Sequence, residues 1–152
     1  MLKMTSLIIA LALGVAGCAQ DDPTVGQQQQ QPEPAGPETV AVTMVEYEFQ
    51  GIPETVAAGE TTFTVENTGE EQHELALVRI VTETPIEELI ELPEKKAQAQ
   101  IEDAGHAFAK PGRSAELEAE LEAGRYGYVC FIPAPDGTPH AFLGMLGEFT
   151  VA

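Results

Sequence analysis

The chain has 152 residues, of which 25 are acidic and 7 are basic, and its formal net charge at pH 7 is −18. This length argues against a two-domain enzyme, and a strong negative charge without any basic stripe excludes nucleic acid as a partner. The 14 Gly, the 11 Pro and a hydrophobic content of 43% indicate frequent turns around a modest core, which predicts an all-β domain rather than a helical bundle.

Residues 1–17 have the layout of a secretory signal peptide. Lys3 precedes an apolar run over residues 7–13, and small residues follow. The run is too short to span a membrane as a stable helix. The last residues before Cys18 are Val15-Ala16-Gly17, and with Cys18 they resemble the lipobox of bacterial lipoproteins, in which the cysteine is lipidated. An ordinary signal with a chance cysteine and an uncleaved anchor are the alternatives, and the polar stretch after Cys18 argues against both.

The lipobox resemblance implies that Cys18 anchors the protein to the extracytoplasmic face of a bacterial membrane. Two or more acyl chains would hold it there stably, whereas one chain would bind only marginally. Residues 18–38 include Gln27–Gln31 and several prolines, and they carry too few apolar side chains to offset the entropy of ordering. They are predicted to form a disordered linker, which leaves residues 39–152 for one folded domain.

The first half of this domain alternates between apolar and polar residues, which predicts β-strands. One strand is expected over residues 40–49 and a second over residues 61–66, which ends at the turn signal Asn67-Thr68-Gly69. A third is expected over residues 73–81.

A short helical insertion is predicted next. Thr84 is the expected N-cap, Pro85 occupies the first turn, and Glu87 and Glu88 lie near the positive end of the helix dipole. Further helical turns are expected over residues 94–102. The insertion is expected to cover a sheet edge or one end of the domain, and His106 is expected to lie in the loop that follows and to bind no metal.

The segment over residues 115–124 reads AELEAELEAG, and its amino acids favour a helix by intrinsic propensity. Its alternation of apolar residues with glutamates has the period of a strand, and we expect the period to decide. Strands are also expected over residues 125–131 and 147–151. About seven short strands with one helical insertion predict an all-β, Greek-key β-sandwich.

With Cys18 lipidated, Cys130 has no intrachain partner in an oxidising compartment. It is therefore a buried inert thiol, half of an intermolecular disulfide, or a metal ligand. His73, His140 and Met145 supply two imidazoles and a thioether, and with a thiolate they form a ligand set suited to copper, in which methionine is a weak axial ligand.

These residues resemble the cupredoxins, the blue-copper family of plastocyanin and azurin. The resemblance rests on Asn67-Thr68-Gly69 followed by His73, on Tyr128-Val129-Cys130, and on His140 and Met145 in that order. It implies a cupredoxin-like sandwich with one copper ion that cycles between Cu(I) and Cu(II), held by His73, Cys130, His140 and Met145.

The chain departs from the family pattern at two positions. Nine residues separate Cys130 from His140, where the best-known members have only a few, and Pro133 and Asp136-Gly137 are turn formers that can fold the excess away. Glu74 stands where many members have an asparagine that ties the ligand loops together. Asn67, Glu74 and Phe131 are the residues expected to surround and orient the ligands.

The function expected from the resemblance is a membrane-anchored one-electron carrier that turns over no substrate. Its acidic surface would steer it toward a redox partner with a basic patch, although a salt-adapted proteome would also explain the charge. Copper delivery or storage is the first alternative, and a metal-free interaction domain of the same fold is the second. A multicopper enzyme would need more than three His, and zinc hydrolysis would leave Met145 unexplained.

Overall fold

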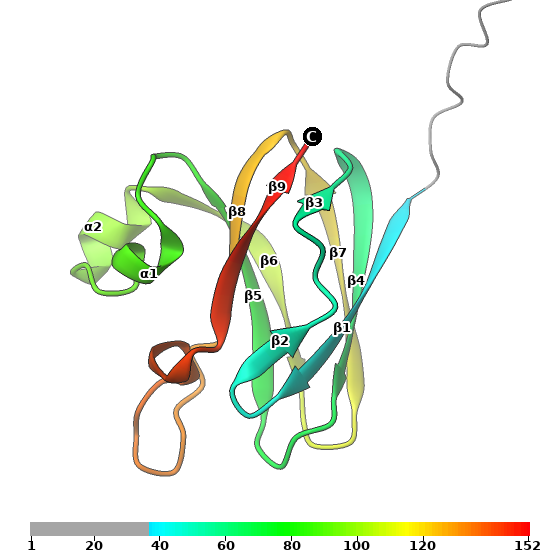
Figure 1. Ribbon diagram of the computed structural model, residues 1–152, viewed down its shortest axis with the longest axis vertical. Coiled ribbons are helices and arrows are strands. Elements are labelled where there is room, and N and C mark those ends of the chain that lie inside the picture. The colour runs from blue at the N-terminus through cyan, green and yellow to red at the C-terminus, as the bar shows by residue number, and fades with distance from the viewer. Residues whose placement is uncertain (1–36) are drawn as a thin grey trace, which may run out of the picture. The chain divides into compact units, whose positions relative to one another are not determined.

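The computed structural model describes residues 37–152, which form a β-sandwich with a helical insertion on one side (Figure 1). The four-stranded sheet has the order β2-β1-β4-β7, and its strands are β1 (Glu38–Val45), β2 (Glu48–Gln50), β4 (Gly59–Asn67) and β7 (Ser114–Leu121). The five-stranded sheet has the order β3-β9-β8-β5-β6, and its strands are β3 (Thr55–Val56), β5 (His73–Ile80), β6 (Ile101–Ala109), β8 (Gly124–Val129) and β9 (Leu146–Val151). The all-β sandwich predicted from the sequence is confirmed.

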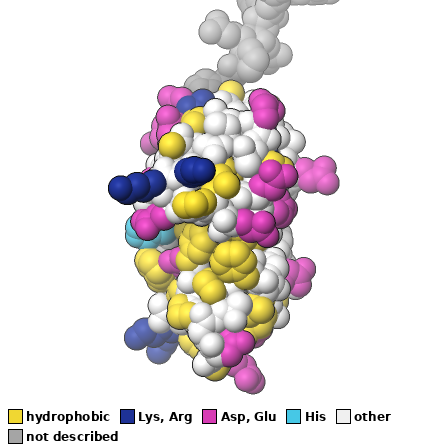
Figure 2. Space-filling view, turned by 90° about the vertical axis from the view of Figure 1, so that its left-hand side faces the viewer, with side chains coloured by type: hydrophobic (Ala, Val, Ile, Leu, Met, Phe, Trp, Pro, Cys, Tyr) yellow, Lys and Arg dark blue, Asp and Glu magenta, His cyan; other side chains and the backbone are white. Residues whose placement is uncertain are grey.

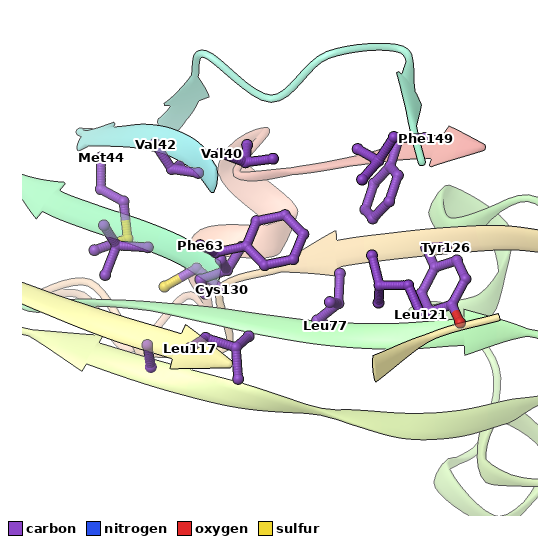
Figure 3. Packing of buried hydrophobic residues seen from close by; sticks show 14 of the residues in the cluster. Val40, Val42, Met44, Phe63, Leu77, Leu117, Leu121, Tyr126, Cys130 and Phe149 are labelled. Carbon is purple, nitrogen blue, oxygen red and sulfur yellow. The ribbon is translucent and has the colours of Figure 1, made fainter. Parts of the chain in front are cut away.

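The core lies between the two sheets and is built from the alternate residues of each strand. Figure 3 shows side chains such as Phe63, Leu77 and Phe149 pointing into this space, with Cys130 among them. Because side chains alternate across a strand, a strand with one buried face needs an apolar residue at every second position. The sequence meets this requirement in β4, where Phe63 and Val65 are fully buried.

The segment in which helical propensity conflicts with a period of two forms strand β7. Leu117 and Leu121 are buried, whereas the glutamates between them are exposed. The strand pairs with β4 in an antiparallel register that places Leu117 opposite Phe63. Burial of one face therefore overrides the helical propensity of Ala, Leu and Glu.

The strand expected over residues 40–49 is two strands. The chain reverses at Glu46-Tyr47, so that β2 folds back on β1 and Phe49 pairs with Met44. The alternation continues through the reversal, which is why the sequence pattern does not reveal it. Glu46, which lies in this turn, contacts the loop before β5: its carboxylate accepts the N–H groups of Glu70 and Glu71.

The loop expected around His106 is wrong, because this residue lies in strand β6 and pairs with Ala76. Its ring is exposed and packs edge-on against Phe108, with ring centroids 5.2 Å apart. β6 is an edge strand in which only Ala107 and Ala109 are buried. Such a strand lacks the apolar alternation from which it would have been predicted.

The helical insertion consists of α1 (Ile86–Leu89) and α2 (Glu94–Gln98). The prediction that Thr84 caps the first helix is wrong. Pro85 is the N-cap residue, the Thr84 hydroxyl bonds to Gln100, and the Ile86 N–H donates to the Glu148 carboxylate at 2.7 Å. A carboxylate from strand β9 thus satisfies the N–H that a local cap would have taken.

The insertion packs on the outer face of the five-stranded sheet, rather than over an edge or an end. Ile86 and Leu89 are buried against Val78 and Leu146, and the Ile86 side chain lies over Gly127. Figure 1 shows both helices beside this sheet, away from the four-stranded one. None of the helices among residues 37–152 is long and apolar enough to cross a membrane. The predicted signal peptide, Cys18 and nearly all of the predicted linker lie outside the described residues.

Candidate metal centre

Three strands deliver polar side chains to the same end of the sandwich core. In β4 the inward-facing series of Phe63 and Val65 ends at Asn67, and in β5 the series of buried residues begins at His73. Cys130 follows strand β8 directly. All three polar residues have exposed fractions of 0%. The period of two that builds the core therefore also places these residues in it.

The second histidine comes from the loop that joins β8 to β9. His140 begins a 3-10 helix, η1 (His140–Leu143), and is also fully buried. Its N–H donates to the Ile132 carbonyl, and the Ala141 N–H donates to the Cys130 carbonyl at 2.7 Å. These bonds fix the returning half of the loop against the half that leaves Cys130.

The residues between Cys130 and His140 fold back on themselves. Pro133 and Pro139 form a bridge, the Ala134 N–H donates to the Thr138 carbonyl at 2.8 Å, and the Asp136 carboxylate accepts the Thr138 N–H. The turn formers in this segment therefore remove the additional length, as the sequence predicts. The long spacing between Cys130 and His140 does not keep them apart.

The ligand atoms of His73, Cys130 and His140 all lie within 4.8 Å of one another. The Nδ1 atoms of the two histidines are 3.0 Å apart, and the Cys130 Sγ is 3.4 Å from the His140 Nδ1. Bonds of about 2.0–2.3 Å from one metal ion to nitrogen and sulfur would place ligand atoms about 3.2–3.7 Å apart. Two of the three separations are close to this range and all three are within 4.8 Å, so the three atoms can be ligands of one metal ion.

Each imidazole contacts a carboxylate through its other nitrogen. The Nε2 of His73 is 3.2 Å from the Glu46 Oε1, and the Nε2 of His140 is 2.9 Å from the Glu71 Oε2. The Tyr47 hydroxyl donates to Glu71 at 3.3 Å, and the Tyr47 ring packs on the His140 ring with centroids 4.7 Å apart. Glu46, Tyr47 and Glu71 are not predicted from the sequence as site residues, because the turn after β1 and the loop before β5 that bring them to the site leave no local pattern.

Burial favours a neutral ring at His73, although the nearby carboxylates favour a protonated one. Burial lowers the pKa of His73, and this outweighs the opposing effect of Glu46. For Glu46, burial acts to raise the pKa, but hydrogen bonds from the Glu71 N–H, His73 and the Glu70 N–H hold it below its usual value. An ionised carboxylate can only accept, so the Nε2 of His73 carries the hydrogen and its Nδ1 presents a lone pair to the centre.

Cys130 lies against the backbone of strand β5. The N–H of Glu74 donates to its Sγ at 3.4 Å. Burial raises the pKa of the Cys130 thiol, against the lowering effect of hydrogen bonds from the backbone of Glu74 and Ile132. The sulfur is therefore protonated near neutral pH unless a cation takes the place of its proton.

Met145 is fully buried at the end of the loop, immediately before β9. Its carbonyl accepts the Cys130 N–H at 3.1 Å, and its own N–H donates to the His140 carbonyl at 3.0 Å. The backbone of Met145 therefore contacts two of the three residues that surround the centre.

Asn67 fixes the loop that precedes His73. Its amide donates to the carbonyls of Glu71 and Ala109 at 2.7 and 2.8 Å, and its carbonyl oxygen accepts the Gly69 N–H. The loop is thereby closed around a buried side chain.

Glu74 and Phe131 join the two ligand-bearing strands. The Glu74 carboxylate accepts the Phe131 N–H at 3.1 Å, while the Phe131 side chain is 49% exposed. The glutamate at position 74 therefore links strand β5 to the segment after Cys130 through its carboxylate.

Comparison with known proteins identifies structures with the same fold. No protein-family model matches the chain, and no curated protein matches it. Auracyanin from Roseiflexus castenholzii, in its dithionite-reduced form, is 21% identical with a TM-score of 0.54, and the match covers 77% of this chain and 99% of that one. Auracyanin A, a "blue" copper protein from Chloroflexus aurantiacus, is 22% identical with a TM-score of 0.55, and the match covers 77% of this chain and 100% of that one. Residues 37–152 therefore form a cupredoxin β-sandwich.

Proposed function

We propose that this protein is a one-electron carrier with one copper ion. His73 and His140 would hold the ion through Nδ1, Cys130 as a thiolate, and Met145 through its thioether sulfur. When bound, copper supplies the Cu(I)/Cu(II) couple. The observation that carries the proposal is the convergence of three buried ligand atoms within 4.8 Å.

The chemistry of the donor set supports copper. One thiolate with two imidazoles and an adjacent thioether is the set that blue-copper sites use, whereas magnesium and calcium prefer oxygen ligands. Two solved structures with a similar fold are auracyanins, one of which is itself described as a blue copper protein.

Burial of the ligands supports a resident ion rather than a cargo. His73, His140 and Cys130 have exposed fractions of 0%, and the surrounding loops are fixed by backbone hydrogen bonds. A delivery protein must release its metal to an acceptor, which requires ligands that the acceptor can reach. A rigid, buried site instead keeps the reorganisation on electron transfer small.

The surface near the ligands supports contact with another protein. Phe131 follows Cys130, Phe142 and Leu143 follow His140, and these three side chains are 41–52% exposed. Figure 2 shows hydrophobic side chains gathered on the side that carries the loop and the insertion, with several acidic side chains and a few basic ones around them. A redox partner with a basic patch around an apolar centre would complement this surface.

The proposal places the protein on the extracytoplasmic face of a bacterial membrane, held by lipid on Cys18. Its support is the signal-like sequence of residues 1–17 and the lipobox-like residues before Cys18. Radiolabelled palmitate tests it: the wild type should be labelled and recovered with membranes, whereas the Cys18→Ala variant should not be labelled.

The test of copper binding is a titration of the purified full-length protein with Cu(II). One equivalent should bind and give an intense visible thiolate-to-copper absorption band, and cyclic voltammetry should detect a reversible one-electron wave. The Cys130→Ser variant should lose the band. A colourless wild type without stoichiometric copper would reject the proposal in favour of a metal-free interaction domain.

A further inference from the structure

We infer that Glu46 and Glu71 are positioning residues of the metal centre, which hold the two imidazoles with Nδ1 toward the ion and supply negative charge behind them. This inference rests on the proposed copper site. It concerns two of the 25 acidic residues, which no motif marks out.

The first contact orients His73. Its ring is fully buried, and its Nε2 lies 3.2 Å from the Glu46 Oε1 while its Nδ1 faces His140. A neutral imidazole has one N–H and one lone pair, so a carboxylate on Nε2 assigns the hydrogen to that side. The lone pair of Nδ1 is then available to a metal.

The second contact orients His140 in the same way, with Nε2 toward a carboxylate and Nδ1 toward the centre. Its Nε2 lies 2.9 Å from the Glu71 Oε2, and Tyr47 donates its hydroxyl hydrogen to the other oxygen of this carboxylate. With both rings held in this way, two nitrogen lone pairs face each other at 3.0 Å. Two facing lone pairs repel, and a cation between them relieves the repulsion.

The two glutamates form one connected unit. Glu46 accepts the N–H groups of Glu70 and Glu71 at 2.6 and 2.7 Å, so the residue that orients His73 also fixes the backbone of the residue that orients His140. Gly69 makes room for this arrangement, since a Cβ atom at this position would collide with the Glu46 carboxylate.

The arrangement has the form of carboxylate–histidine–metal triads, in which the carboxylate fixes the ring and increases its basicity. Its electrostatic consequence concerns the two oxidation states of copper. Negative charge behind the ligands stabilises Cu(II) more than Cu(I), because Cu(II) carries the greater charge. The two glutamates therefore lower the reduction potential of the site.

The first test uses the copper-free full-length protein. Long-range ¹H–¹⁵N NMR spectra report which nitrogen of each imidazole carries the hydrogen. Both histidines of the wild type should have the hydrogen on Nε2. Glu46→Ala should change the spectrum of His73, and Glu71→Ala should change that of His140. Unchanged tautomers in both variants would overturn the inference, whether or not the wild type binds copper.

The second test uses the copper-loaded proteins. Glu46→Ala and Glu71→Ala should each weaken Cu(II) binding by about 10- to 100-fold. Glu46→Gln and Glu71→Gln keep an acceptor oxygen but remove the charge, so both should raise the reduction potential. Gly69→Ala should reproduce the effect of Glu46→Ala by displacing its carboxylate.

Glu70→Gln is the matched control, because it removes the same charge from the same loop and the Glu70 side chain makes no hydrogen bond or ion pair among residues 37–152. It should leave both the tautomers and the Cu(II) affinity as in the wild type. If all the variants have the wild-type affinity and potential, the inference fails while the copper site stands. If the wild type binds no copper, the proposed function is rejected, and so is the role of Glu46 and Glu71 in metal binding.

Discussion

The Glu74 carboxylate accepts a hydrogen bond from the N–H of Phe131 at 3.1 Å, while the N–H of Glu74 donates to the Sγ of Cys130. One residue on β5 therefore contacts both the thiol sulfur and the residue that follows Cys130. The first contact depends on the glutamate side chain and the second does not, so the two can be separated by mutation.

Glu74→Ala should release the Phe131 N–H and leave the fold intact. Without its acceptor this N–H opens to solvent more often, so hydrogen exchange at Phe131 should become faster. Glu74→Gln keeps an acceptor oxygen and should exchange more slowly than Glu74→Ala. Measurement is by NMR on the copper-free protein. Equal exchange in the wild type and Glu74→Ala would mean that this bond does not hold the loop.

Asn67→Ala should destabilise the copper-free protein by about 2–3 kcal/mol, because the carbonyls of Glu71 and Ala109 would lose the amide that satisfies them in the buried interior. The measurement is urea unfolding. Thr68→Ala is the control, because its side chain is exposed in the next position of the same turn and should change stability by less than about 0.5 kcal/mol. Equal midpoints for the two variants would contradict the role of Asn67.

Sequence periodicity predicts the residues that make the sandwich. Residues 115–121 form a strand in spite of their helical propensity, because a half-buried strand needs a period of two and a helix does not. The same period places His73 and Cys130 in the core. The structure brings the ligand atoms of both residues within 4.8 Å of that of His140.

The rest of the site depends on contacts between distant segments. Glu46 and His73 are 27 positions apart, and Glu71 and His140 are 69 apart. Either glutamate alone is indistinguishable in the sequence from any other acidic surface residue. Thr84 illustrates the same limit for a helix end, because the carboxylate that receives the Ile86 N–H is that of Glu148, 62 positions away.

Gly127→Ala should destabilise the contact between the helical insertion and the sheet. A Cβ atom at this position would lie 2.8 Å from the Cδ1 of Ile86 and 3.1 Å from its Cγ1. Such overpacking costs about 1–3 kcal/mol in protein cores. Thermal unfolding of the copper-free protein measures this loss.

Ile86→Val removes the Cδ1 atom and provides the control for this contact. Combined with Gly127→Ala, it should give a loss of stability smaller than the sum of the two single losses, because the closer of the two contacts disappears with the Cδ1 atom. Strict additivity would mean that the added methyl group is accommodated without displacing α1.

Copper binding should release about one proton, from the thiol of Cys130. Burial raises the pKa of this thiol above its ordinary value of 9.0, so the copper-free protein carries the proton at pH 7, whereas the metal requires the thiolate. Below the pKa of the thiol, a proton competes with the metal for the sulfur. Each increase of one pH unit lowers the proton concentration tenfold, so the apparent copper affinity should rise about tenfold.

Calorimetric titrations in two buffers of different ionisation enthalpy count the released proton. In Cys130→Ser the serine hydroxyl does not ionise in this range, so its residual copper binding should release about one proton fewer. The same proton count in both proteins would show that Cys130 does not bind the ion as a thiolate.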